Sequence, residues 1–258
     1  MRWNRHHFLG LVGLLVATLG CGGGGSSSNP PNSTLPATNL DPSAIYQGNF
    51  GPSSNAANDV THGIILPSGE ARLLLRYGSQ IVGNLQISGS GFSCNATMYT
   101  SPGIQSMTIT NGIINRTIAS GQANLSGSFA TAGISDTFTL YSEQNINDPS
   151  MVKSLSNLAG TWRAEANNQT SSVYTQGYIS GSVDTNGNFT GSISSGGTVT
   201  AQFTQIAPGA NAFRATVQCN GQTYSGLAYT QVYAPNPDGF LNILASNATG
   251  QFYAAFHH

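Results

Sequence analysis

The sequence predicts an all-β protein with two small antiparallel β-barrel or sandwich domains in tandem, after a signal peptide and a flexible linker. Three observations predict this. Apolar and polar residues alternate with a period of two over many short runs, and Gly and Asn separate those runs. Only 7% of the residues are charged, which leaves Ser, Thr, Asn and Gln to cover the surface. Alternation interrupted by turn residues is typical of antiparallel sheets with one buried face.

Residues 1–20 are predicted to be a lipoprotein signal peptide. Arg2 and Arg5 precede an apolar run, residues 8–20, that is too short to span a bilayer. The stretch 17–21 (ATLGC) resembles the lipobox of bacterial lipoproteins, with Thr18 in place of the usual Leu. The alternative is an ordinary secretory signal, in which Cys21 is an incidental thiol.

The lipobox resemblance implies that Cys21 is the lipidation site and that the protein is attached to a membrane by its lipid anchor. Each buried methylene contributes about 0.8 kcal/mol, so two or three acyl chains hold a protein almost permanently. Gly22 stands where Asp would retain a Gram-negative lipoprotein at the inner membrane, which favours the outer membrane. Residues 21–40 carry no charge and few large apolar residues, and therefore predict a lipid-anchored flexible linker.

The N-terminal β domain is predicted over residues 41–147, with about eight strands. In the run 72–77, Leu73, Leu75 and Tyr77 form one face, and the residues 81, 83, 85 and 87 form one face of the next run. A short helix capped by Ser150 is expected after this domain.

The C-terminal domain, residues 148–258, is predicted to be β-barrel-like, again with about eight strands. A three-residue loop at 185–187, with Gly in the left-handed position, would set Val183 opposite Phe189 and Ile179 opposite Ile193. The segments 45–50 and 158–162 are similar, and this predicts a weak internal duplication. A single large β domain is the alternative.

Two resemblances concern the folded part. Gly160-Thr161-Trp162 resembles the first strand of lipocalin- and avidin-like barrels. The layout as a whole, with a lipobox, a Gly/Ser spacer and a hairpin at 63–69, resembles uncharacterised two-domain β lipoproteins of proteobacteria. That resemblance implies a location in the bacterial envelope and a two-domain β architecture, and it implies no activity.

The sequence predicts no catalytic residue, metal ligand set or cofactor. It contains no Gly-x-Ser-x-Gly elbow, and its acids are scattered. His257 and His258 could bind a metal only weakly without a third ligand. Cys94 and Cys219 alternate with apolar residues, which favours buried free thiols in separate cores. The alternative is a disulfide between them, which would require the two halves to share one core. Without the signal peptide the net charge is −3, which argues against nucleic acid as a partner.

Three functions are compatible with these observations. The first is a membrane-anchored lipoprotein of the bacterial envelope that acts as a non-enzymatic binding module for an envelope protein, a glycan or a small apolar ligand. The alternative is a small-ligand carrier with a lipocalin/avidin-like barrel, for which the inward Gly181 and Gly191 would leave space. The third is an enzyme, which would require His62 and two acids together in a pocket. The many aromatic residues could bind sugars or peptides if exposed, or could simply pack the strands.

Overall fold

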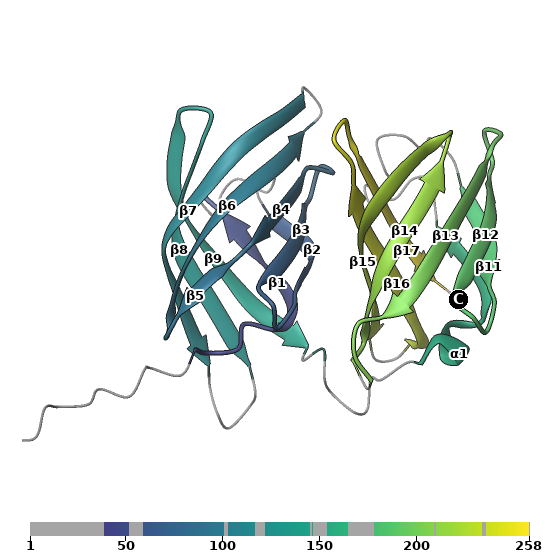
Figure 1. Cartoon of the computed structure of the whole chain (residues 1–258), viewed down its shortest axis with the longest axis horizontal. Helices are drawn as coiled ribbons and strands as arrows, with labels where there is room; N and C mark the ends of the chain where they lie inside the picture. Colours follow the sequence, from purple (N-terminus) through teal and green to yellow (C-terminus); the bar gives the residue numbers. More distant parts are fainter. Residues whose placement is uncertain are drawn as a thin grey trace, which may run out of the picture. The chain divides into compact units, whose positions relative to one another are not determined.

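The structure is a computed structural model that describes residues 39–51, 59–100, 103–116, 122–144, 146, 154–164, 178–208, 210–233 and 236–257. Residues 37–258 form one compact unit, distinct from residues 1–36. Cys21, the signal peptide and nearly all of the predicted linker lie outside the described residues. The described part confirms the predicted fold class, because it forms two closed antiparallel barrels in tandem (Figure 1).

The first barrel is a meander in which each strand except the fourth pairs with the next one along the chain. Its strands are β1 (Ala44–Phe50), β2 (Asp59–Ile65), β3 (Glu70–Leu75), β4 (Gln80–Asn84), β5 (Gln86–Ser88), β6 (Gly91–Thr100), β7 (Gly103–Arg116), β8 (Ala123–Thr131) and β9 (Ile134–Gln144). Pairing of β1 with β9 and of β4 with β6 closes the barrel. Because β4 and β5 pair with successive parts of β6, they behave as one strand interrupted at Leu85, and the barrel has eight sides.

The second barrel begins with the short helix α1 (Leu155–Leu158) and has the same meander topology. Its strands are β10 (Gly160–Ala164), β11 (Ile179–Val183), β12 (Asn188–Ile193), β13 (Thr198–Gln205), β14 (Ala212–Cys219), β15 (Gln222–Tyr233), β16 (Asn236–Ser246) and β17 (Gln251–His257). Pairing of β10 with β17 closes it.

Each barrel has its own apolar core, because alternate residues of every strand point inward. In the first core, the Phe50 ring stacks on Phe138 with 4.8 Å between ring centroids and meets Phe129 edge-on at 5.3 Å. Cys94 belongs to this core and Cys219 to the other, and both are free thiols. The prediction of two buried, unpaired cysteines in separate cores is therefore confirmed.

The first strand of each barrel is anchored in the same way. The Tyr46 hydroxyl donates to the Pro42 carbonyl at 2.6 Å, and Trp162 Nε1 donates to the Leu158 carbonyl at 2.8 Å. In both cases a buried aromatic side chain hydrogen-bonds to the backbone four residues earlier. The shared topology and the shared anchor are consistent with an internal duplication.

The predicted hairpin has the expected register. Val183 pairs with Phe189 and Ile179 with Ile193, and Gly187 has a φ of +82°. The Asp184 carboxylate accepts hydrogen bonds from the backbone N–H groups of the loop and of the next strand, which holds the turn. Loop length and apolar alternation required the same register, and this agreement explains why the prediction was accurate.

One local expectation lies outside the described residues, and another needs correction. The expected cap Ser150 is not among the described residues, and the helix that is described begins at Leu155 with Ser154 as its cap. Tyr77 does not continue an inner face: β3 ends at Leu75, and Tyr77 lies in the following turn, 63% exposed. His257, one of the two C-terminal histidines, is the last residue of β17.

Candidate functional site

A third apolar cluster, which we call the junction, lies outside both barrels where their outer walls meet. It contains Ile45, Ile64, Leu66, Leu74 and Ile146 from the first half, and Ala212, Leu227, Tyr229, Leu244 and Tyr253 from the second. Leu74 therefore lies on the outer face of β3 together with Arg72, and the second barrel covers it. The signal that could have revealed the junction is the uninterrupted apolar run, as in 64–66 and 73–75, because strands buried on both faces lose alternation.

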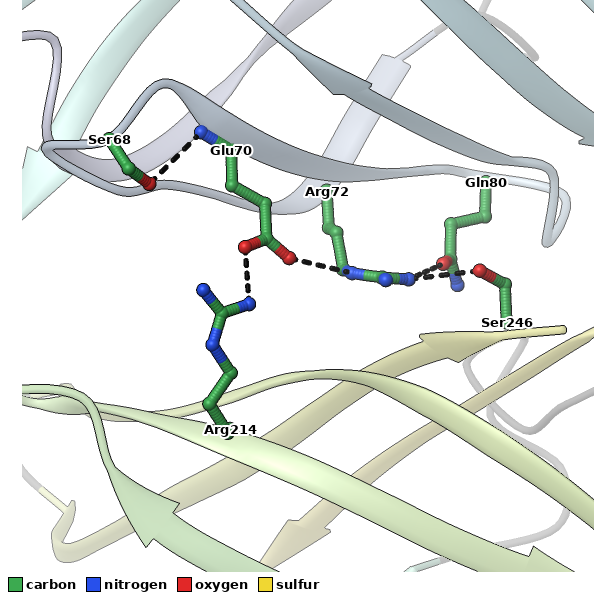
Figure 2. Close-up of polar contacts among 6 residues, drawn as sticks. All are labelled: Ser68, Glu70, Arg72, Gln80, Arg214 and Ser246. Atoms are coloured by element: carbon green, nitrogen blue, oxygen red, sulfur yellow. Dashed lines mark hydrogen bonds and ion pairs between the residues drawn. The ribbon is translucent and has the colours of Figure 1, made fainter.

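Arg72, only 8% exposed, crosses the junction (Figure 2). Its guanidinium donates to Gln80 Oε1 at 3.3 Å and to Ser246 Oγ of the second barrel at 3.1 Å. Glu70 Oε1 lies 3.7 Å from Arg72 Nε, and Glu70 also forms an ion pair with Arg214 of the second barrel. Burial lowers the pKa of Arg72, and the Glu70 carboxylate opposes that shift. These contacts tie β3 to β14 and β16.

A second polar group at the junction surrounds His62 on β2. Its side chain hydrogen-bonds with Gln231 of the second barrel, and its ring centroid lies 5.7 Å from that of Tyr253. Gln231 also donates to Glu143 at 3.0 Å and accepts from Asn242 at 3.1 Å. Burial lowers the pKa of His62 to about 4, although the hydrogen bond with Gln231 partly opposes this, so the imidazole is neutral near pH 7.

Among the described residues, the contacts of His62 lead through Gln231 to one acid, Glu143. An enzyme site was expected to bring two acids together with His62 in one pocket, whereas these contacts bring one. Within the described ranges, no group of three or more His, Cys, Asp or Glu residues could hold a metal ion.

The interior of the first barrel leaves little room for a ligand. A cavity of about 20 Å³ lies among its apolar side chains. This is space for a single water molecule, whereas pockets for small organic ligands measure roughly 300–1,000 Å³. In the second barrel, a Cβ on Gly181 or on Gly191 would come within 2.7 Å of the Phe189 ring. These glycines, expected to leave space for a ligand, instead make room for Phe189.

An open groove of about 450 Å³ lies on the outer wall of the first barrel, and we call it the β1 groove. It is lined by Gln47, Gly48 and Asn49 of β1, Asp59, Val60 and Thr61 of β2, and Thr139 and Tyr141 of β9. The cross-strand pairs Gln47–Tyr141 and Asn49–Thr139 bring these segments together, although they are distant in the sequence.

Local backbone irregularities shape the β1 groove. The β1–β2 register shifts between Tyr46 and Gly48, and the β1–β9 register shifts between Ile45 and Tyr46. Gly48 has a φ of +150°, and a Cβ on it would clash with the Thr139 carbonyl oxygen. Bulges increase the twist of a strand and redirect its side chains, so the curvature of this wall depends on these positions.

A second groove, of about 510 Å³, lies at one end of the second barrel, between the β12–β13 and β14–β15 turns. Hydroxyl and amide side chains such as Thr198, Thr200, Gln218 and Asn220 line it, and the described lining includes no aromatic ring.

Five aromatic side chains that the sequence left open as sugar or peptide contacts are buried, which agrees with strand packing: Tyr46, Trp162, Tyr224, Tyr229 and Tyr253. Tyr141, 50% exposed, is the aromatic residue that lines the β1 groove.

Comparisons with known proteins add little. No protein-family model matches the chain, and no curated protein sequence matches it significantly. One solved structure that matches is described as a glycoside hydrolase, the family 43 YxiA protein from Bacillus licheniformis, with 10% identity and a TM-score of 0.32 over 69% of this chain. The match spans about half of that protein, 52% of its length. Among the described residues, no helix has the length and apolarity needed to cross a membrane.

Proposed function

We propose that this protein is a lipid-anchored, non-enzymatic binding module of the bacterial envelope whose ligands bind the outer walls of its barrels. Binding to the outer walls is supported by the difference in volume between a groove on the outside of a barrel and the cavity inside it. The β1 groove measures about 450 Å³, whereas the cavity inside the first barrel measures about 20 Å³. The lipocalin-like alternative concerns the second barrel, where the Phe189 ring fills the space beside Gly181 and Gly191. A carrier would require interior space, so both observations favour the binding module.

The anchor in this proposal depends on Cys21, lipidated after removal of residues 1–20 and followed by an uncharged linker. Gly22 supports the outer membrane as the destination. The lipid attaches the protein to the membrane, and the linker leaves the barrels free to meet an envelope protein, a glycan or a small apolar ligand.

Metabolic labelling tests the anchor. Cells that express the full chain are fed an alkyne fatty acid, and the protein is purified and coupled to a fluorophore. We expect label on the wild-type protein and none on Cys21→Ser. An unlabelled wild-type protein would show that Cys21 is an incidental thiol.

Affinity capture from envelope extracts tests the binding role, with Thr139→Trp as a variant that fills the β1 groove. We expect the wild-type protein to retain an envelope component that Thr139→Trp loses. If neither protein retains a component above background, the binding module is refuted.

A further inference from the structure

The outer wall around the β1 groove continues as rows of cross-strand neighbours. In one row, Asn115, Asn124, Tyr141 and Gln47 follow one another across β7, β8, β9 and β1. The next row runs through Ile113, Ser126, Thr139, Asn49 and Asp59. Directly paired side chains on one face lie about 4.5–5.5 Å apart at Cβ. The wall is therefore a continuous surface of mostly amides and hydroxyls, from which two large side chains, Tyr141 and Ile113, are also exposed.

This surface has almost no unbalanced charge. Among the described residues that line the β1 groove, Asp59 is the only one with a carboxylate. It accepts a hydrogen bond from Asn49 at 3.1 Å and pairs with Arg76 at 3.3 Å. A strongly charged ligand would therefore find no complementary charge here, and a neutral polar ligand suits the groove better.

The side chains match the chemistry of a sugar. A neutral saccharide presents hydroxyl groups that both donate and accept hydrogen bonds, as do the amides of Gln47 and Asn49. It also presents an apolar C–H face, for which the half-exposed ring of Tyr141 offers a flat apolar surface. The groove volume, about 450 Å³, falls in the range of pockets for small ligands.

We propose that the β1 groove binds a neutral oligosaccharide, with one sugar ring stacked on Tyr141 and its hydroxyls hydrogen-bonded to Gln47 and Asn49. This inference rests on the proposed function, because it names the ligand class for the same outer-wall site. A protein partner is the competing occupant. It is less favoured because most of the lining side chains end in an amide or a hydroxyl and the aliphatic one, Val60, is buried, whereas the centre of a stable protein interface is mainly apolar.

The test uses the purified full chain in detergent micelles and two panels of immobilised oligosaccharides. One panel is neutral, and the other carries uronates or sulfates. We expect binding to neutral members only. Tyr141→Ala should weaken it at least about tenfold, as expected for the loss of one aromatic contact, and Thr139→Trp should abolish it. Tyr178→Ala, at a tyrosine of similar exposure (47%) in the second barrel, and Gln218→Ala, in the second groove, should bind as wild type.

Failure of the glycan inference and failure of the proposed function give different results. Preference for the charged panel, or neutral binding unchanged in both Tyr141→Ala and Thr139→Trp, overturns the glycan inference. If the panels stay blank while an envelope protein is captured and lost with Thr139→Trp, the groove is a protein-docking site and the proposed function stands. Thermal unfolding of each variant checks that lost binding does not reflect lost folding.

Discussion

His62 makes the stability of the protein sensitive to acid. Its pKa in the folded protein is about 4, below the ordinary value of 6.5, because the ring is buried at the junction. Between these two values the unfolded chain binds the proton more readily than the folded chain does. The contribution of His62 to stability is therefore fully present above pH 6.5 and is lost as the pH falls toward 4.

The size of this effect follows from the two pKa values. A tenfold difference in acid constants is worth 1.36 kcal/mol, so the whole contribution is about 3 kcal/mol. About 2.5 kcal/mol of it is lost between pH 7 and pH 4.5. Glu143, linked to His62 through Gln231, also belongs to this polar group, and other carboxylates titrate in the same interval. A comparison with a variant that lacks only the imidazole separates the effect of His62.

The assay is urea unfolding of the full chain at pH 7 and pH 4.5, followed by tryptophan fluorescence, for the wild type and His62→Gln. Glutamine keeps a hydrogen-bonding side chain but does not titrate. We expect the wild type to lose about 2.5 kcal/mol more than His62→Gln over this interval. Equal losses in the two proteins would refute the assignment of this acid sensitivity to His62.

The other predictions concern packing. Cys94 and Cys219 should resist thiol reagents in the folded protein and both react after denaturation without reductant, because burial hides them and raises the pKa of each thiol. Gly48→Ala should destabilise the protein by more than about 3 kcal/mol, since its Cβ would clash with backbone. Gly78→Ala, which faces open space at a φ of +85°, should cost about 1 kcal/mol. Arg72→Ala should cost about 2 kcal/mol, measured by urea unfolding, because Gln80 loses its buried donor.

Each of these experiments has a control. Thiols are titrated in the Cys21→Ser chain, so that two reactive groups are expected after denaturation and fewer would indicate a disulfide. Arg76→Ala removes an ion pair with a side chain that is 48% exposed and should cost under about 1 kcal/mol. Equal costs for Gly48→Ala and Gly78→Ala, or for Arg72→Ala and Arg76→Ala, would contradict the packing argument.

Sequence patterns predicted the strands that face solvent on one side. On β14, Phe213, Val217 and Cys219 point inward and alternate with exposed polar residues, so periodicity alone identified the buried face. The hairpin at 185–187 was predictable in register because its turn chemistry added an independent constraint. Both features depend on residues that are close together in the chain.

The junction and the β1 groove depend instead on which walls lie beside each other. Gln47 and Tyr141 are neighbours because the first strand of the barrel pairs with the last, and local periodicity carries no information about such closure. Leu74 points outward, as its alternation suggests, but the second barrel covers that wall. An apolar residue on the outward face of a strand indicated that another part of the protein covers that face. No comparable pattern in the sequence indicated the groove.

The junction and the β1 groove occupy successive stretches of the same strands. Along β1, Ile45 packs in the junction and Gln47 lines the groove. Along β2, Ile64 packs in the junction and Thr61 lines the groove. His62 follows Thr61 in the chain, between these two positions. The register shifts of both strand pairs fall at this boundary, where the outer wall changes from an apolar face to a polar one. Because a ligand that binds only the folded wall stabilises it by mass action, occupation of the groove should also stabilise the strands that form the junction.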